Sequence, residues 1–195
     1  MKKNLFLIAA LVLGATAAVS TNVSAADTPA NGEGKATLNI TAGTFSQVGA
    51  PSFSFETKID NALVTAGKSV TSIGSADTYQ TLKVSDYVGT DNGWTVTAKL
   101  DAFDNPDVKV GSLVITPGDV KTDSDAISAG KDFTLVPGDA AADVASAQTG
   151  AGDTTLAYAD NSAKLNLSKN TKVASSTAIL TWKATQGKIT APKFN

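Results

Sequence analysis

The sequence predicts an all-β protein, a single-domain antiparallel β-sandwich or partly open barrel with Ig-like character. Apolar and polar residues alternate in short runs along the chain, and these runs are rich in Thr and Val. Alternation with a period of two indicates strands that each have one buried face. About nine such runs, at intervals of roughly 8–20 residues and separated by Gly, Asp, Asn and Pro, are typical of a sandwich or barrel. No convincing amphipathic helix and no repeat of fixed period accompanies them.

The N-terminal segment has the three parts of a secretory signal peptide. Lys2 and Lys3 supply positive charge, residues 5–13 form an unbroken apolar run, and residues 23–25 (VSA) supply the small side chains that signal peptidase requires. The apolar run is too short and wrongly flanked for a membrane span. We therefore expect residues 1–26 to be a signal peptide, cleaved after Ala25 or Ala26, and the protein to be secreted.

The rest of the chain divides into a leader and one domain. Residues 27–35 (DTPANGEGK) are polar and contain Gly and Pro, which predicts a flexible leader. Residues 36–195 contain all the alternating runs, and no linker divides them. The predicted strands, in chain order, are residues 37–41, 52–56, 81–85, 93–100, 112–116, 132–136, 154–158, 163–168 and 177–184. Residues 140–148 (AAADVASAQ) fit a helical turn and a strand equally well.

Missing residue types exclude several kinds of chemistry. All 16 basic residues are Lys, and the chain has no His, Arg or Cys. This rules out a Ser-His-Asp triad, a Cys nucleophile, a His or thiolate zinc site, a disulfide, and a bidentate Arg clamp. A pI near 5.0 argues against a nucleic-acid partner. No catalytic constellation is recognisable, so we expect no enzymatic activity and no cofactor.

An acidic segment follows one of the predicted strands. Residues 101–107 (DAFDNPD) contain three Asp and one Asn, and oxygen-rich loops of this kind suit calcium. The spacing does not match an EF-hand loop, and Asp and Asn are ordinary turn formers. Asp119, Asp123 and Asp125 are scattered in the same way. The favoured interpretation is therefore a solvated loop, with no metal.

Two tryptophans mark the most regular strands. In residues 93–100 (GWTVTAKL), Trp94 is in phase with Val96, Ala98 and Leu100. In residues 177–184 (TAILTWKA), the second tryptophan is in phase with the other apolar residues, namely Ala178, Leu180, Trp182 and Ala184. In-phase apolar residues share a buried face, which favours two indoles in the core, in one cluster on adjacent or facing strands. The alternative is that the rings stack directly on sugars.

These two segments resemble the WxL domain of low-GC Gram-positive bacteria. The resemblance rests on the GW-T-V segment in mid-chain and the L-T-W segment near the C-terminus. It is supported by ATLNIT at residues 36–41, by LKVSDYVGTDNGW leading to Trp94, and by residues 143–152 followed by AKLNL. It spans essentially the whole mature chain. Two departures stand out: Val96 replaces the Leu of the family name, and Ser176 replaces a Tyr usual six residues before the second Trp.

The resemblance implies an exported domain that attaches non-covalently to the Gram-positive wall, with peptidoglycan as its receptor. The motif residues that would bind the wall or a partner, or form the motif core, are Trp94, Thr95, Val96, Leu180, Thr181 and Trp182. Family members also act with surface proteins, including WxL-interacting and sortase-anchored proteins. An interaction protein that docks on such partners is therefore the alternative, and a secreted hydrolase is a weaker third. The C-terminal segment contains no sorting sequence or apolar anchor, which favours non-covalent attachment.

The net charge of the chain limits which contacts could bind such a domain to the wall. Without Lys2 and Lys3, 14 Lys face 18 acidic residues, a net charge of −4. Anionic teichoic acids should repel this domain at neutral pH. Attachment would then come from sugar stacking, from hydrogen bonds of Thr, Asn and Ser, from a local Lys patch, or from a partner protein. We expect wall binding to strengthen as pH falls and Asp is protonated.

Overall fold

The structure is a computed structural model that describes residues 35–90, 92–123, 127–149 and 152–187. The predicted signal peptide and nearly all of the predicted leader lie outside the described residues. Residues 40–195 group into one compact unit by their contacts, separate from residues 1–39.

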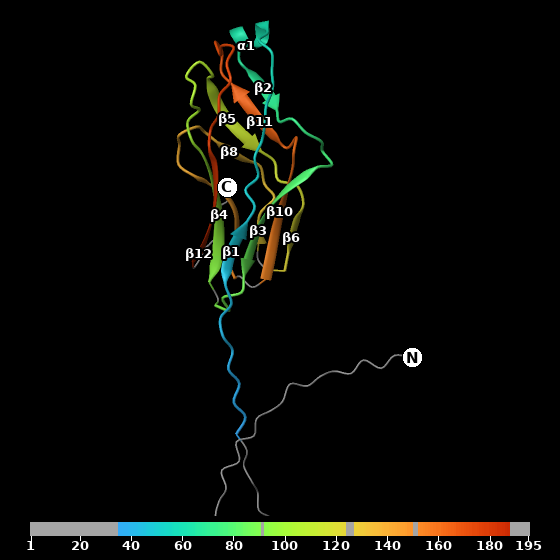
Figure 1. The fold of residues 1–195 in the computed structure, drawn as a ribbon, viewed down its shortest axis with the longest axis vertical. Coiled ribbons are helices and arrows are strands. Elements are labelled where there is room, and N and C mark those ends of the chain that lie inside the picture. The colour runs from blue at the N-terminus through green and yellow to red at the C-terminus, as the bar shows by residue number, and fades with distance from the viewer. Residues whose placement is uncertain (1–34, 91, 124–126, 150–151, 188–195) are drawn as a thin grey trace, which may run out of the picture. The chain divides into compact units, whose positions relative to one another are not determined.

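Within the described residues the chain forms twelve strands and one short helix (Figure 1). In chain order the elements are β1 (Phe45–Val48), α1 (Asn61–Thr65), β2 (Lys68–Thr71), β3 (Tyr79–Asp86), β4 (Gly93–Leu100), β5 (Val110–Ile115), β6 (Val120–Thr122), β7 (Ile127–Ser128), β8 (Phe133–Leu135), β9 (Ala142–Ala147), β10 (Gly152–Ala159), β11 (Ala163–Leu167) and β12 (Leu180–Gly187).

The strands form three four-stranded sheets, and every pairing is antiparallel. The strand orders are β1-β3-β10-β6, β2-β11-β5-β8 and β12-β4-β9-β7. The sheets do not close into a barrel. The all-β prediction is therefore confirmed, with the sandwich as the form that the sheets take.

One hydrophobic core joins the three sheets. Its largest fully buried side chains include Trp94, Tyr158, Leu82, Ile115 and Leu156, from strands of all three sheets. The alternating sequence pattern produces this directly, because successive side chains of a strand point to opposite faces. In β3, for example, Leu82 and Val84 are buried while the residues between them are not.

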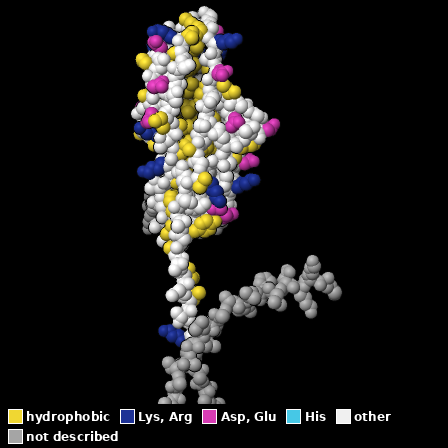
Figure 2. Space-filling view, viewed as in Figure 1, with side chains coloured by type: hydrophobic (Ala, Val, Ile, Leu, Met, Phe, Trp, Pro, Cys, Tyr) yellow, Lys and Arg dark blue, Asp and Glu magenta, His cyan; other side chains and the backbone are white. Residues whose placement is uncertain are grey.

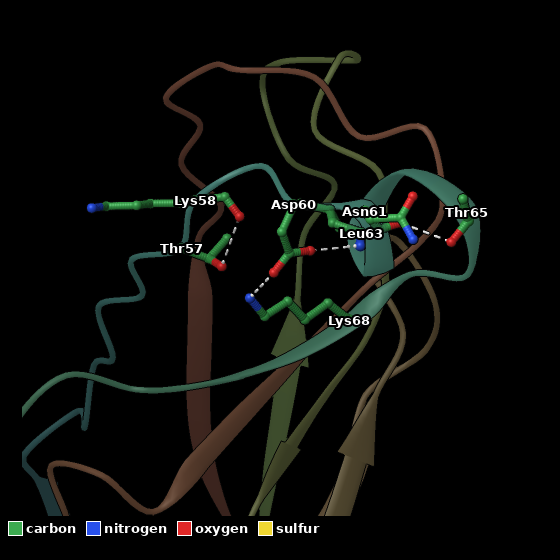
Figure 3. A network of polar contacts seen from close by, with 7 residues as sticks. All are labelled: Thr57, Lys58, Asp60, Asn61, Leu63, Thr65 and Lys68. Atoms are coloured by element: carbon green, nitrogen blue, oxygen red, sulfur yellow. Dashed lines mark hydrogen bonds and ion pairs between the residues drawn. The ribbon is translucent and has the colours of Figure 1, made fainter.

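Helix α1 is short and begins at a capped turn (Figure 3). The Asp60 carboxylate accepts a hydrogen bond from the backbone N–H of Leu63 and an ion pair from Lys68, whose Nζ lies 2.6 Å away. Both contacts favour the charged carboxylate, so the pKa of Asp60 is lowered, with Lys68 as the larger cause. The cap places Leu63, which is buried, under the turn.

Two predicted strands are absent from the structure. Residues 37–41 form no strand, and Leu38 and Ile40 are 82% and 86% exposed, because no described strand pairs with them. Residues 52–56 are not a strand either: the Gln80 side-chain amide, and not a neighbouring strand, bonds the backbone N–H and C=O of Ser52. An alternating pattern predicts a strand only where a partner strand is available.

Other boundaries and elements also differ from the sequence prediction. Residues 142–147 form strand β9, which decides between the helical turn and the strand. The last predicted strand begins at Leu180, three residues late, and residues 177–179 precede it without strand pairing. Four strands and the helix were not predicted, namely β1, β2, β6, β7 and α1. Each has five residues or fewer, too few to produce a clear periodic pattern.

Candidate functional site

The two tryptophan-bearing strands lie side by side and pair along their full length. β12 runs antiparallel to β4, with Trp182 opposite Ala98 and Gln186 opposite Trp94. Opposite residues of an antiparallel pair point to the same face of the sheet. Both indoles therefore enter the same core from adjacent strands, four positions apart, and both belong to one cluster. The prediction of adjacent strands and a single cluster is confirmed.

Both indoles are covered by protein. Trp94 is 1% exposed and Trp182 is 7% exposed. The Trp182 ring contacts the ring of Tyr158 with centroids 5.3 Å apart, and that of Phe133 edge-on at 5.9 Å. Its Nε1–H donates to the backbone carbonyl of Pro51 at 2.9 Å. These contacts leave no indole face open for a sugar, so the rings serve as the structural centre of the two strands.

Close packing between β4 and β9 requires a glycine at position 93, directly before Trp94. A Cβ built on Gly93 would collide with the backbone carbonyl of Ala147 in β9. Any larger residue would push β9 away from β4 at the point where Trp94 and Ala147 pair. The Gly-Trp pair thus follows from close strand packing.

The opposite face of the same two strands is polar. Three cross-strand pairs line it, and we call their six residues the threonine–lysine face: Thr95–Thr185, Thr97–Lys183 and Lys99–Thr181. Thr181, Lys183, Thr185 and Lys99 are exposed, and Thr95 and Thr97 are half-buried. The middle residues of the two motifs, Thr95 and Thr181, therefore reach the surface while the tryptophans beside them do not.

The charges near this face are few and partly neutralised. Lys99 pairs with Asp101, with Nζ and Oδ1 2.9 Å apart. Lys183 makes no ion pair with any described residue. Asp143 of β9 lies opposite Thr97 on the other side of β4, so one carboxylate borders the face. The face thus offers a row of hydroxyl groups and one unpaired cation within an acidic protein.

The remaining predicted motif residues, Val96 and Leu180, lie on the core side of their strands. Val96 is fully buried beside Trp94, and Leu180 is half-buried at the start of β12. The structure therefore separates the six predicted residues into two groups. Trp94, Val96, Leu180 and Trp182 point to the core side, whereas Thr95 and Thr181 lie on the outer face.

A side chain of β1, which sequence pattern could not place, hydrogen-bonds to the outer edge of β12. The Gln47 amide of β1 accepts a hydrogen bond from the backbone N–H of Ala184 at 2.6 Å, and donates to the carbonyl of Trp182 at 3.4 Å. These two bonds imitate those of a neighbouring strand. They block strand addition at the middle of β12.

The acidic segment at residues 101–107 makes hydrogen bonds and an ion pair with residues 172–177. The Asp104 carboxylate accepts hydrogen bonds from the backbone N–H of Thr177 and the hydroxyl of Ser176, which lower its pKa. Asp107 pairs with Lys172 at 2.6 Å. Among the described residues, no group of three or more carboxylates is arranged to hold a metal ion. Ser176 is thus part of this polar contact.

A long groove lies beside the tryptophan strands. Two segments outside the strands, residues 50–59 and 171–179, form its sides, and its volume is about 1130 Å³. Its floor is apolar and comes from several elements, including Leu63, Val70, Leu113, Leu165 and Leu167. Figure 2 shows hydrophobic side chains gathered in a vertical band between these segments. The groove was not predicted from the sequence, which predicts strands at residues 52–56 and 177–184 and so covers part of each side.

Comparison with known proteins assigns the chain to a family. A family model described as WxL domain surface cell wall-binding matches residues 18–187. No curated protein and no solved structure matches the chain. Within the described residues, no helix is long and apolar enough to cross a membrane. The matched range covers most of the sequence and includes both tryptophan strands. The chain belongs to the family of WxL domains, which are surface domains that bind the cell wall.

Proposed function

We propose that this chain attaches to the cell wall by direct, non-covalent contact between peptidoglycan and the threonine–lysine face. The observation that carries the proposal is the register of β4 and β12, which gathers four Thr and two Lys on one face. The motif tryptophans are buried, so a wall polymer has to meet other residues of the motif strands. Thr95 and Thr181 are the motif residues that reach this face.

The chemistry of the face suits a neutral or mildly acidic glycan. Threonine hydroxyls donate and accept hydrogen bonds, as sugar hydroxyls and acetamido groups do. Lys183 has no ion pair with a described residue and would meet a carboxylate of the polymer. The net charge of −2 for the whole chain opposes binding to strongly anionic teichoic acids. This combination favours peptidoglycan as the receptor.

The face is also a stable platform. Its backbone is held by eight cross-strand pairs between β4 and β12. On the opposite face of the two strands, Trp94 and Trp182 pack into the hydrophobic core. Side chains held on a paired sheet lose less freedom on binding than side chains on a loop. The tryptophans would then assist attachment by positioning the threonines and lysines, without touching the polymer.

Sedimentation with purified wall tests the proposal. The exported chain is incubated with washed, protein-free peptidoglycan sacculi, and the pelleted fraction is measured against intact cells. The proposal expects the chain in the sacculus pellet. Failure to pellet with sacculi, together with binding to intact cells, would instead support docking on a surface protein or another polymer.

A further inference from the structure

One segment of the chain has the pattern of a strand without a partner. In residues 36–41 (ATLNIT), Leu38 and Ile40 alternate with polar residues as Leu82 and Val84 do in β3. In β3 these apolar residues are fully buried, whereas Leu38 and Ile40 are 82% and 86% exposed. The first backbone hydrogen bond to a described residue comes only at Gly43, whose N–H donates to the carbonyl of Tyr87. We call residues 36–41 the unpaired arm.

The two segments that form the sides of the groove also lack a strand partner. Residues 50–59 and 171–179 run along its two sides and belong to no strand, and within the described residues no backbone hydrogen bond joins the two segments. The backbone bonds of each segment lead to other parts of the chain. Ser54 accepts from Ile73. On the other side, Lys172 donates to Asp107, Thr177 accepts from Asp104 and Ile179 accepts from Asp101, so one edge of this segment is bonded to residues 101–107. Extended segments with free backbone groups are templates for strand addition.

The unpaired arm suits this groove in length, polarity and charge. Six extended residues span about 20 Å, at roughly 3.3 Å per residue. Leu38 and Ile40 would point to the apolar floor, while Thr37, Asn39 and Thr41 would face solvent. The arm carries no charge, so it needs no ion pair inside the groove. The groove of about 1130 Å³ is larger than most small-molecule sites, which are about 300–1,000 Å³.

The arm of the same chain is too short to fill the groove. Gly43 is bonded to Tyr87 next to the start of β1, and the groove begins at Ala50, beyond the other end of β1. Folded back from Gly43, residues 36–42 reach about 23 Å, the length of seven extended residues. Seven residues on the other side of Gly43 lead to Ala50, where the groove only begins. The arm of the same chain therefore reaches only the beginning of the groove, whereas the arm of a second copy has no such limit.

We propose that the unpaired arm of one copy inserts as a β-strand into the groove of a second copy. Residues 50–59 and 171–179 of the acceptor supply the backbone hydrogen bonds, and its apolar floor covers Leu38 and Ile40 of the donor. The donor's own groove stays open for a third copy, so the contact is head-to-tail and builds chains of molecules. This assembly uses a different surface from the threonine–lysine face and stands independently of peptidoglycan binding.

Cysteine pairing tests the exchange, because the chain contains no cysteine of its own. Ile40→Cys is placed on one preparation and Val173→Cys on another, since Val173 lines the groove and is 87% exposed. The two are mixed and oxidised with diamide. The proposal expects a covalent heterodimer that an excess of synthetic peptide of residues 35–42 suppresses at least several-fold. Val136→Cys, exposed but outside the groove, is the matched control and should give only background cross-linking.

Sedimentation velocity of the unlabelled chain gives the second readout. The proposal expects concentration-dependent association, lost in Leu38→Asp/Ile40→Asp and retained in Thr37→Asp/Thr41→Asp, which adds the same charge to the opposite face of the arm. A chain that stays monomeric at all concentrations would overturn the proposal. So would equal cross-linking of Val136→Cys and Val173→Cys. Loss of association in both arm variants would also contradict it, because it would show that charge and not strand polarity decides.

Discussion

Trp182 donates its indole N–H to the backbone carbonyl of Pro51 across 131 positions of sequence, over 2.9 Å. This bond joins the second motif strand to the beginning of the extended segment that borders the groove. Trp182 also contacts the rings of Tyr158 and Phe133. One motif side chain thus links three sheets and one side of the groove, which explains a tryptophan here without any contact to a ligand.

Trp182→Phe is expected to destabilise the fold without changing the wall-binding surface. The smaller ring leaves a void and leaves the buried Pro51 carbonyl without its donor, which together cost about 2–4 kcal/mol. Chemical denaturation measures the loss. At temperatures where the variant is folded, its binding to sacculi should equal that of the wild type. Loss of binding by a fully folded variant would show that the indole contacts the polymer.

Tyr158→Phe is expected to have the opposite effect on stability. The Tyr158 hydroxyl is buried and has no hydrogen-bond partner among the described residues, and burial raises its pKa. Removing an unpaired buried hydroxyl should stabilise the fold by about 1 kcal/mol, while the ring contact with Trp182 is kept. The same denaturation experiment checks the sign. A clear destabilisation would mean that the hydroxyl makes a bond in solution.

Asp104→Asn tests the polar contact that holds residues 171–179. The Thr177 N–H and the Ser176 hydroxyl lower the pKa of Asp104 below its ordinary value of 3.8. A lowered pKa means that the ionised carboxylate contributes stability above about pH 4, and that the contribution is lost as pH falls through the folded-state pKa. Asp104→Asn should lower the unfolding temperature at pH 7 and flatten its decline below pH 4.

Asp139→Asn is the control for that experiment. Asp139 is exposed, and its side chain makes no ion pair with another described residue. The unfolding temperature of this variant should match that of the wild type at both pH values. Equal effects of Asp104→Asn and Asp139→Asn would show that net charge, and not the contact with residues 176–177, is responsible.

Wall binding is expected to strengthen as pH falls from 8 to 4. Protonation of carboxylates reduces the negative charge that repels an anionic wall. Asp60, Asp104 and Asp153 contribute least to this gain, because their contacts lower each pKa and keep them charged longest. The pelleted fraction is measured across this range at constant ionic strength. Equal retention at pH 4 and pH 8 would exclude the electrostatic contribution.

The sequence predicted the strands correctly where an alternating apolar pattern also has a neighbouring strand to pair with. β4 lies at residues 93–100 as predicted, and β3, β5, β8, β10 and β11 lie within a few residues of their predicted positions. Residues 37–41 have the same alternation and form no strand, because sequence pattern does not say whether a neighbouring strand exists. The short strands β6 and β7 have too few residues to show a period at all.

The candidate site was predicted less completely than the fold. The sequence singled out the two tryptophan segments, and strand alternation correctly placed their indoles in one buried cluster. Only the register between β4 and β12 shows that Thr95 lies opposite Thr185 and Thr181 opposite Lys99. Pairing over about 90 positions of sequence leaves no trace in a local pattern. The same holds for the Gln47 amide on the edge of β12 and for the groove.

The central claim is that the threonine–lysine face, and not the tryptophans, contacts the wall. The most direct measurement compares two triple variants in the sacculus sedimentation assay: Thr95→Val/Thr181→Val/Thr185→Val, and the control Thr71→Val/Thr81→Val/Thr134→Val on exposed positions of other strands. Valine keeps the branched shape and strand preference of threonine and removes only the hydroxyl. The account predicts at least tenfold weaker binding for the first variant and wild-type binding for the control. Wild-type binding by the first variant, with both proteins folded, would contradict it.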